Sequence, residues 1–250
     1  MRRFDILGSY HKKNIELFVA SPKEKISTVT IFVHGLYGVF NELDNKDKVN
    51  ITIDELLKKN ISHVLAYNSS RDFSYDENLN FELRQKAFEF KTFQQELEDL
   101  KLAVSWAIDN CAIFFGIPKI QLALNIHGTS LGGTLAILQS DFFPKIKKIS
   151  LCGSGCGTNG SQKPILSSIF SEQAILDSVA EFSGKLLLFQ GGNDTVVPKE
   201  SGLKILEHAK KADVKYIVID GANHNFSKMN GIESDAPKQE FASIVVDFLG

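Results

Sequence analysis

Short apolar runs alternate along the chain with longer stretches in which apolar residues recur every three or four positions. Six short runs are rich in β-branched residues, and most of them are nearly continuous in apolar residues: Thr28–Val33, Ser62–Ala66, Gln121–Ile126, Ile146–Leu151, Lys185–Gln190 and Val214–Ile219. Strands of this kind are typical of parallel sheets, whose two faces are both covered by helices. An earlier run, Asn14–Val19, alternates polar and apolar residues, and we expect it to form an antiparallel edge strand.

The stretches between these runs have the period of amphipathic helices. The clearest places apolar residues on one face, at Phe93, Leu97, Leu100, Val104, Ile108 and Cys111. Further helices are predicted at Leu131–Gln139, at Ile165–Phe182, after Pro198, and around Phe241 to Phe248. Strands that alternate with helices in this way predict an α/β protein with a mostly parallel central sheet and helices on both faces.

One stretch, residues 68–89, has no clear period. It follows a predicted strand, so it is expected over the carboxyl edge of the sheet, where α/β proteins bind ligands. Its aromatic residues are Phe73, Tyr75, Phe81 and Phe88. We interpret the stretch as a lid-like insertion, and because nothing else in the chain resembles a linker, we expect a single domain over residues 1–250.

Composition excludes several classes of protein. The 250 residues include 28 Lys and Arg against 30 Asp and Glu, so a net charge of −2 gives no electrostatic basis for binding nucleic acid or a membrane surface non-specifically. The 3 cysteines are too few for a disulfide framework. Residues 1–8 lack the apolar core of a secretory signal, and no apolar run is long enough to span a membrane. We therefore expect a cytoplasmic protein.

The strongest chemical signal is Gly128-Thr129-Ser130-Leu131-Gly132, which follows the run Gln121–Ile126 and precedes a predicted helix. A sharp turn from strand to helix forces the central serine into a strained backbone conformation, and glycine two positions to either side avoids a clash. Such a turn raises the serine hydroxyl above the sheet beside the free amides of the helix N-terminus. The pattern predicts that Ser130 is a nucleophile.

A serine nucleophile needs a base within hydrogen-bonding reach. His224 lies in a loop just after the predicted strand Val214–Ile219, at the same edge of the sheet as Ser130. His127 precedes the turn and is expected to point away from the serine hydroxyl. We expect structural or solvent-exposed positions for His11, His63 and His208. His34 follows the run Thr28–Val33, and its side chain is expected to be buried and hydrogen-bonded. His224 is therefore the predicted base.

The base needs a carboxylate to orient it. Asp194 follows directly after the strand Lys185–Gln190, which places it at the same sheet edge. The alternative roles for Asp194 are to open a turn or to cap the next helix. Asp220 is a rival beside the His224 loop, and Asp177 and Glu181 are expected on a helix. We favour Asp194.

The order Ser130, Asp194, His224 is that of the α/β-hydrolases. The chain resembles an α/β-hydrolase of the serine-esterase kind, similar to feruloyl esterases, monoacylglycerol lipases and acyl-peptidase catalytic domains. The segments that carry the resemblance are residues 31–38, 126–133, 191–198 and 221–224, which occur in the order of the family. The resemblance implies an α/β-hydrolase fold with little or no cap domain, because residues 153–184 leave little room for one.

The resemblance also implies an oxyanion hole formed by the backbone amides of Leu36 and Leu131. Two such amides aimed at the developing oxyanion can each lower the barrier by about 3–4 kcal/mol. Tyr37 and Arg71 are candidate substrate-binding residues, with Arg71 suited to a carboxylate. The implied activity is hydrolysis of small or medium acyl or aryl esters through an acyl-enzyme on Ser130. A thioesterase or peptidase with the same triad, and a non-catalytic binding protein, remain alternatives.

Other chemistry has less support. Residues 155–160 match the G-x-G-x-x-G pattern, but Ser161 to Pro164 follow in place of a helix, so we interpret the pattern as a loop at the active-site edge. The cysteines and histidines lack the spacing of metal ligands, and there is no phosphate-binding loop of the P-loop type. No cofactor or metal is therefore predicted. The expected partner is a small-molecule ester, and the sequence does not determine the oligomeric state.

Overall fold

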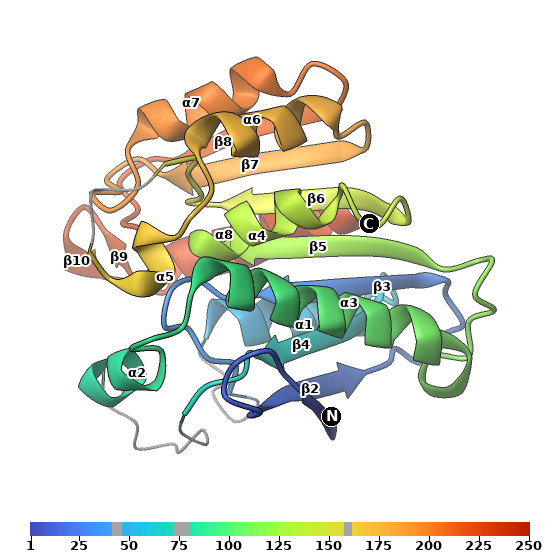
Figure 1. Cartoon of the computed structure of the whole chain (residues 1–250). Helices are drawn as coiled ribbons and strands as arrows, with labels where there is room; N and C mark the ends of the chain where they lie inside the picture. The colour runs from blue at the N-terminus through green and yellow to red at the C-terminus, as the bar shows by residue number, and fades with distance from the viewer. Residues whose placement is uncertain (42–46, 73–80, 158–161) are drawn as a thin grey trace.

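The computed structural model of the chain describes residues 1–41, 47–72, 81–157 and 162–250. Within them one sheet has strands in the order β1-β2-β4-β3-β5-β6-β7-β8, with helices on both faces (Figure 1). The strands are β1 (Arg2–Leu7), β2 (Asn14–Ala20), β3 (Thr28–Val33), β4 (His63–Asn68), β5 (Ala123–Thr129), β6 (Ile146–Cys152), β7 (Lys185–Gly191) and β8 (Asp213–Ile219). β4 to β8 are parallel to β3 and to one another, whereas β1 and β2 are antiparallel to their neighbours. The predicted mostly parallel sheet is confirmed.

The edge of the sheet differs from the prediction. Asn14–Ala20 is antiparallel, as expected, but it is not the edge strand, because β1 pairs along its outer side from Arg2 opposite Val19 to Leu7 opposite Asn14. The charged residues of β1 are solvent-exposed, and only Phe4 and Ile6 pack against the core. Two apolar residues among charged ones are too weak a pattern to predict a strand from the sequence. The strand forms because the backbone groups along the free edge of β2 pair with it.

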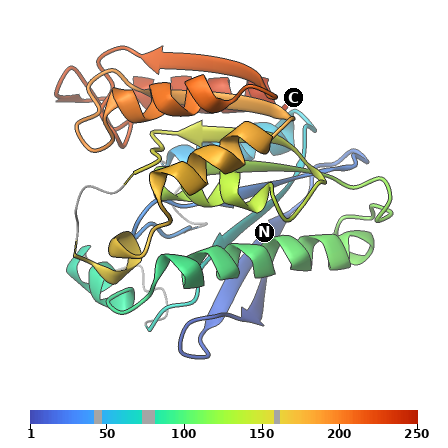
Figure 2. The same ribbon diagram turned by 45° about the horizontal axis from the view of Figure 1, so that its top comes forward.

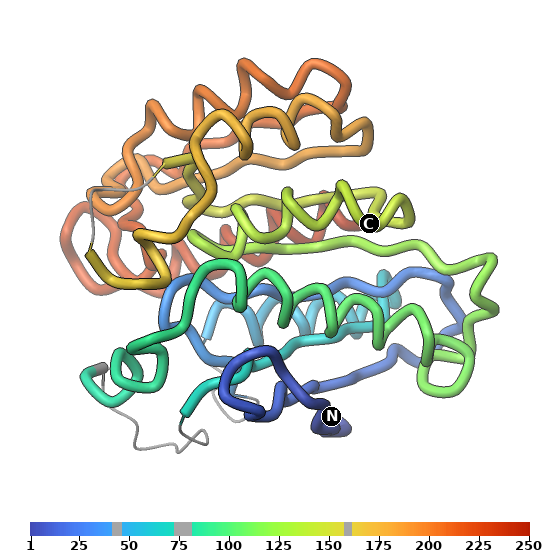
Figure 3. Tube along the Cα trace, viewed as in Figure 1, coloured from blue at the N-terminus to red at the C-terminus, as the bar shows by residue number. Residues whose placement is uncertain are grey.

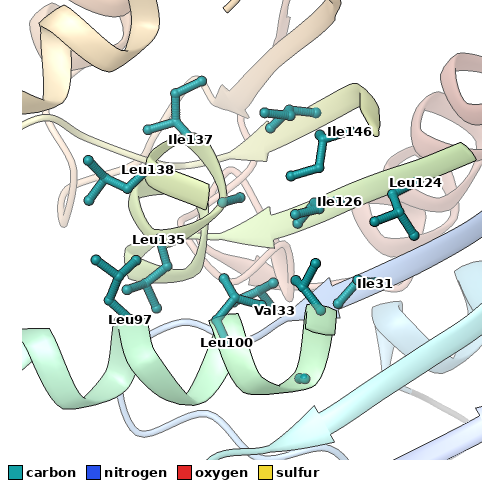
Figure 4. Close-up of a cluster of buried hydrophobic side chains, with 14 of the residues drawn as sticks. Ile31, Val33, Leu97, Leu100, Leu124, Ile126, Leu135, Ile137, Leu138 and Ile146 are labelled. Atoms are coloured by element: carbon teal, nitrogen blue, oxygen red, sulfur yellow. The ribbon is translucent and has the colours of Figure 1, made fainter. Parts of the chain in front are cut away.

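Helices cover each face of the sheet and enclose a separate apolar core. On one face lie α3 (Phe93–Phe114), α4 (Leu131–Gln139), α6 (Glu172–Glu181) and α7 (Lys199–His208), and on the other α1 (Lys48–Lys58) and α8 (Ala236–Leu249). Strand residues alternate between the cores as the pleat requires: Ile31 and Val33 face α3 and α4 (Figure 4), whereas Phe32 belongs to the core under α1 and α8.

Two helical regions depart from the sequence prediction. Ile165–Phe182, predicted as one helix, is divided into α5 (Pro164–Ser167) and α6, whose first turn is capped by the Ser171 hydroxyl accepting from the Ala174 amide. Helix α1 was not predicted. Its β-branched residues Val49, Thr52 and Ile53 favour strands locally, but burial of its apolar face against α8 stabilises the helix.

The stretch predicted as a lid-like insertion is anchored where it begins. Asn68 ends β4, and the Ser70 amide and hydroxyl both donate to Asp99 of α3. Lys91 donates to the same carboxylate at 2.7 Å, and both of these charged side chains are fully buried. Residues 69–72 are therefore held against α3. Residues 73–80, with the predicted aromatics Phe73 and Tyr75, lie outside the described residues, and α2 (Phe81–Ala87) follows them.

The carboxyl ends of the parallel strands lie on the left in Figure 1. Helices α2 and α5 lie at this edge, as does a small second sheet of β9 (Lys228–Met229) and β10 (Ile232–Glu233). The trace in Figure 3 shows the teal segment 81–87 and the yellow segment 164–167 at the same edge. In the described parts of the chain, every helix is too short or too polar to cross a membrane.

Candidate active site

Ser130 stands alone between a strand and a helix. β5 ends at Thr129 and α4 begins at Leu131, and the serine between them has φ 54° and ψ −121°. A non-glycine residue in this region of the backbone map is strained, and such strain is common at functional sites. The structure thus has the sharp turn that the G-x-S-x-G spacing predicts.

Two glycines allow this turn to be so tight. A Cβ on Gly128 would lie 2.3 Å from the Gly132 carbonyl oxygen, and a Cβ on Gly132 would lie 2.4 Å from the His34 carbonyl oxygen. Real Cβ atoms do not approach backbone atoms so closely, so both positions require glycine. The close contact between Gly132 and His34 also packs the N-terminus of α4 against the end of β3.

His224 and Asp194 come from neighbouring loops and meet in a hydrogen bond. His224 Nδ1 lies 2.7 Å from Asp194 Oδ2, and because an ionised carboxylate only accepts, Nδ1 donates. The Asp194 side chain is 1% exposed and that of His224 is 13% exposed. The pair is thus shielded from water apart from the outer part of the imidazole.

The charge on Asp194 is stabilised by its surroundings. Burial by itself would raise the pKa of Asp194, but the hydrogen bond from His224 and those from the Val197 and Val196 amides hold the pKa below its usual range. Those amides donate to Oδ1 at 3.0 and 2.8 Å, which leaves Oδ2 for the histidine. Asp194 is therefore an ionised acceptor with both oxygens in use.

Backbone contacts hold the Asp194 and His224 loops together. The Gly192 amide donates to the Ile219 carbonyl and the Asn193 amide to the Ala222 carbonyl, and a Cβ on Gly191 would lie 2.2 Å from the same Ala222 oxygen. Gly153, at the end of β6, has φ +55° and approaches the pair from the other side. A Cβ there would lie 3.3 Å from Asp194 Oδ2 and from His224 Nδ1. Backbone packing thus fixes the orientation of the imidazole.

Ser130 and His224 open onto one cavity of about 910 Å³. It is bounded by the loop after β3 and by residues of α1, α2, α4, α5, α6 and α7. Its apolar lining includes Leu36, Leu131, Leu166, Ile169, Ile175, Val196 and Val197. Leu166 and Ile169 come from α5 and the turn that follows it, where sequence reasoning had expected one continuous helix. The cavity is large enough for a substrate of medium size.

The amides proposed for an oxyanion hole flank Ser130. Leu131 is the first residue of α4, so its amide has no partner within the helix. The loop that carries Leu36 passes close to the serine, since a Cβ on Gly35 would lie 3.1 Å from the Ser130 Cβ. Among the hydrogen bonds of the described residues, neither the Leu36 nor the Leu131 amide has an acceptor. Both donors remain available for a ligand in the cavity.

The two predicted substrate-binding residues line different cavities, although both lie near the Phe88 ring. Tyr37 lines the cavity of Ser130; its ring lies 5.7 Å from that of Phe88, and the Lys163 ammonium lies 5.0 Å from its centre. Arg71 lines a different, polar cavity of about 290 Å³ near β1 and β2. It is buried there, 5.7 Å from the centre of the Phe88 ring. Phe88 itself is a core residue, so this aromatic of the predicted lid packs locally.

The other histidines have different surroundings. His127 is buried beneath the turn, where Nδ1 lies 3.1 Å from the Ser150 hydroxyl, and burial lowers its pKa to about 3. His34 borders the cavity, and burial followed by the nearby positive charges of Arg71, Lys48 and Arg84 lowers its pKa to about 3. Contrary to our expectation of a hydrogen-bonded side chain, His34 Nε2 is buried with no partner among the described residues.

Among the described residues, none of the rival carboxylates is hydrogen-bonded to His224, which bonds to Asp194. Asp220 is exposed in the turn after β8, and Asp177 and Glu181 lie on α6, where Glu181 pairs with Lys211. The G-x-G-x-x-G loop is described only as far as Gly157, so Thr158 to Gly160 fall outside the described residues. The cysteines are buried, with the pKa of Cys152 raised by burial to about 12. They are therefore poor candidates for nucleophiles.

Sequence reasoning missed several polar residues of the cavity. Arg84 and Gln85 of α2, Lys48 at the start of α1, and Lys163 before α5 all line it. Arg84 lies in the stretch where Arg71 was chosen, and no sequence signal distinguishes the two arginines. The difference between them comes from α2, which was not predicted.

Comparison with solved structures identifies the fold. No protein-family model matches the chain, and no curated protein matches it. An alpha-beta serine hydrolase homologue from Coxiella burnetii is 18% identical, with a TM-score of 0.66 over 100% of this chain and 97% of that one. A dienelactone hydrolase from Anabaena variabilis is 15% identical, with a TM-score of 0.68 over 99% and 96%. Est1E from Butyrivibrio proteoclasticus is 14% identical, with a TM-score of 0.66 over 99% and 98%.

These matches cover almost the whole of this chain and of each neighbour. At such low identity they establish architecture and leave chemistry to be argued from the site itself. The chain has the α/β-hydrolase fold.

Proposed function

We propose that the protein is a serine hydrolase that cleaves carboxylic esters, with Ser130 as nucleophile, His224 as base and Asp194 as the residue that orients the base. The observation that carries the proposal is the hydrogen-bonded pair of His224 and Asp194 on the same cavity as a serine held in a strained turn. The esterases among the structural neighbours are consistent with it.

In the proposed reaction His224 takes the Ser130 proton on Nε2 while its Nδ1–H remains bound to Asp194. The lowered pKa of Asp194 keeps it ionised, so it stabilises the imidazolium that forms. Ser130 attacks the carbonyl carbon of the ester. The carbonyl oxygen of the substrate becomes an oxyanion, which accepts hydrogen bonds from the Leu36 and Leu131 amides. His224 then protonates the departing alcohol. Water, activated by the same histidine, releases the acid from the acyl-enzyme.

The cavity favours esters of small or medium size. Leu166, Ile169 and Ile175 form an apolar surface suited to an acyl chain or an aromatic ring, which corresponds to the substrates that the sequence suggests. One solved structure of Est1E, a structural neighbour, has ferulic acid bound, and ferulic acid is an aromatic carboxylic acid. We include esters of aromatic acids in the proposed range.

Labelling with a fluorophosphonate, followed by intact-mass measurement, tests the proposal without knowledge of the substrate. We expect a single adduct on the wild-type protein, no adduct on Ser130→Ala, and strongly slowed labelling of His224→Ala. Matched controls are Ser201→Ala, which removes another serine that lines the cavity, and His208→Ala, which removes a histidine on α7. Both should be labelled like the wild type.

An adduct on Ser130→Ala would contradict the nucleophile assignment. If the folded wild-type protein forms no adduct, the proposal fails and a non-catalytic binding protein becomes the better interpretation.

A further inference from the structure

The polar wall of the cavity carries both acidic and basic side chains, and two of its three lining acids among the described residues are bonded within the protein. The lining acids among the described residues are Asp47, Glu172 and Glu200. Asp47 accepts from the Val49 amide as the cap of α1, and Glu172 is paired with Lys204 at 2.7 Å. Glu200 is exposed at the start of α7. The lining cations other than Lys204 are Lys48, Arg84 and Lys163.

Two of these cations have contacts within the protein. The Lys48 ammonium donates to the Asn225 carbonyl at 3.1 Å and lies 5.1 Å from the centre of the Phe226 ring. The Lys163 ammonium lies over the ring of Tyr37. Both charges therefore contribute a positive field to the cavity from fixed positions.

Arg84 differs from them. Its Nε is buried and has no hydrogen-bond partner among the described residues. The acid nearest in sequence on α2, Glu82, is paired with Lys86 at 3.2 Å, on an exposed surface of the helix. A buried guanidinium donor without an acceptor is costly, because the water it loses is not replaced. An acceptor supplied by a ligand in the cavity would remove that cost.

The field of these cations reaches the loop beside Ser130. His34 lies in that loop, and after burial the positive charges of Arg71, of Lys48 in α1 and of Arg84 in α2 lower its pKa. A ligand anion beside Arg84 would therefore meet an environment that favours negative charge. On another part of the wall, Leu166, Ile169 and Ile175 offer apolar contact. Arg84 of α2 and Leu166 of α5 line the same cavity, and Figures 1 and 2 show both helices at the same edge of the sheet.

We propose that Arg84 is a specificity-determining residue, and that this cavity takes amphipathic esters that carry a carboxylate, which the Arg84 guanidinium binds while the apolar part of the substrate lies against α5. That the ligand is an ester rests on the proposed function. That Arg84 binds a carboxylate does not, and binding measurements alone can test it. A guanidinium suits the task because its donors match both oxygens of a carboxylate.

Binding is measured first with probes that contain no ester. Calorimetric titration compares 4-phenylbutanoate with 4-phenylbutanamide, which has the same shape without the charge, at low salt. We expect the wild type to bind the acid more tightly than the amide. In Arg84→Gln that preference should fall about 10- to 100-fold, which is the usual strength of hydrogen bonds to a charged group.

Lys86→Gln is the matched control, because it removes one positive charge from the same helix at a position that does not line the cavity. It should keep the preference for the acid. Arg84→Lys keeps the charge but loses the paired donors, so it should retain part of the preference.

Kinetics then place the acid within the substrate. One pair of substrates is the 4-nitrophenyl monoester of glutaric acid with 4-nitrophenyl pentanoate, which puts the charge on the acyl side. The other is the pentanoyl ester of 4-hydroxybenzoate with that of 4-hydroxybenzamide, which puts it on the alcohol side. For one pair, the ratio of kcat/KM between the charged and the neutral ester should fall about 10- to 100-fold in Arg84→Gln and remain at the wild-type value in Lys86→Gln.

The inference is overturned if the wild type shows no preference for the acid in the titration, or if Arg84→Gln and Lys86→Gln reduce the preference equally. If the proposed function is wrong, the results differ: the wild type shows neither fluorophosphonate labelling nor ester turnover, while the preference for the acid in the titration is unaffected.

Discussion

Two parts of the cavity wall are built in different ways. The part that carries Ser130, Asp194 and His224 is formed by strand ends and tight loops, and its geometry is set by backbone contacts at Gly128, Gly132 and Gly191. The opposing part is formed by side chains on α2, α5 and the turns around them. The tight backbone contacts of the first part hold its residues in one arrangement, whereas the shape and charge of the second part depend on which side chains it carries. We infer that the first part determines the reaction and the second the choice of substrate.

The largest expected effect is at Ser130. If the reaction did not depend on the part of the wall formed by strand ends and tight loops, the comparison between the two parts would fail. We expect Ser130→Ala to lower kcat/KM for a 4-nitrophenyl ester by about 10⁴-fold or more, since the nucleophile is lost while the fold is kept. Steady-state kinetics and circular dichroism measure the two quantities. Turnover within tenfold of the wild type would show that another group attacks the ester.

A second prediction concerns the pH dependence of stability, through His34 and His127, which burial keeps uncharged. His34 and His127 have a pKa of about 3 in the folded protein, against an ordinary value of 6.5, so the unfolded chain binds more protons between these values. The contribution of these neutral histidines to the free energy of unfolding is therefore fully present above pH 6.5 and is lost as the pH falls towards 3. At pH 5 each histidine should cost about 2 kcal/mol of the free energy of unfolding.

Urea denaturation at pH 7 and pH 5 measures this loss. In His127→Gln, the difference between the two pH values should shrink by about 2 kcal/mol, whatever the stability of the variant at pH 7. An unchanged difference would mean that His127 is not held neutral by burial.

A third prediction concerns the rigidity of the turn. Gly128→Ala would place a methyl group 2.3 Å from the Gly132 oxygen, and we expect it to lower the free energy of unfolding by about 3 kcal/mol. Gly116→Ala is the control, because nothing lies within 4 Å of its Cβ position and only its φ of +68° is unfavourable. That substitution should cost about 1 kcal/mol. Equal losses would show that the turn is not tightly packed.

The smallest effect is expected on the side-chain wall. Ile169→Ala removes apolar surface from the cavity, which should raise KM for a pentanoyl ester about fivefold with a smaller change in kcat. The same substitution should matter less for an acetyl ester, which does not reach as far. A main effect on kcat for both esters would place Ile169 on the reacting side and break the comparison.

Particular residues show how far sequence reasoning reaches. The apolar runs predicted every strand from β3 to β8, because strands between two layers of helices contain few polar residues. The edge strand β8 follows the rule least, since its Asp213 and Lys215 are exposed. The G-x-S-x-G spacing located the turn at Ser130 since only glycine satisfies the contacts around it. Strand β1 and helix α1 were missed because β1 depends on pairing with β2 and α1 on packing against α8, and neither is a local preference.

The candidate site divides in the same way. Ser130, Asp194 and His224 were chosen because each follows a strand end, and the topology of a parallel sheet brings such ends to one edge. Arg71 and Arg84 could not be told apart by that reasoning, because both lie beyond β4 in a stretch without a period. Their positions depend on how the chain returns after residue 72: Arg71 stays beside β2, and α2 carries Arg84 to the cavity.

The sequence by itself thus determined the strands β3 to β8, the turn at Ser130 and the placing of the predicted acid and base at the same edge, because these follow from periodicity and from the steric demands of glycine. Only the tertiary structure decided which side chains face the proposed nucleophile across the cavity. The faces of α2 and α5 are selected by packing between elements distant in sequence, and no local pattern records that choice.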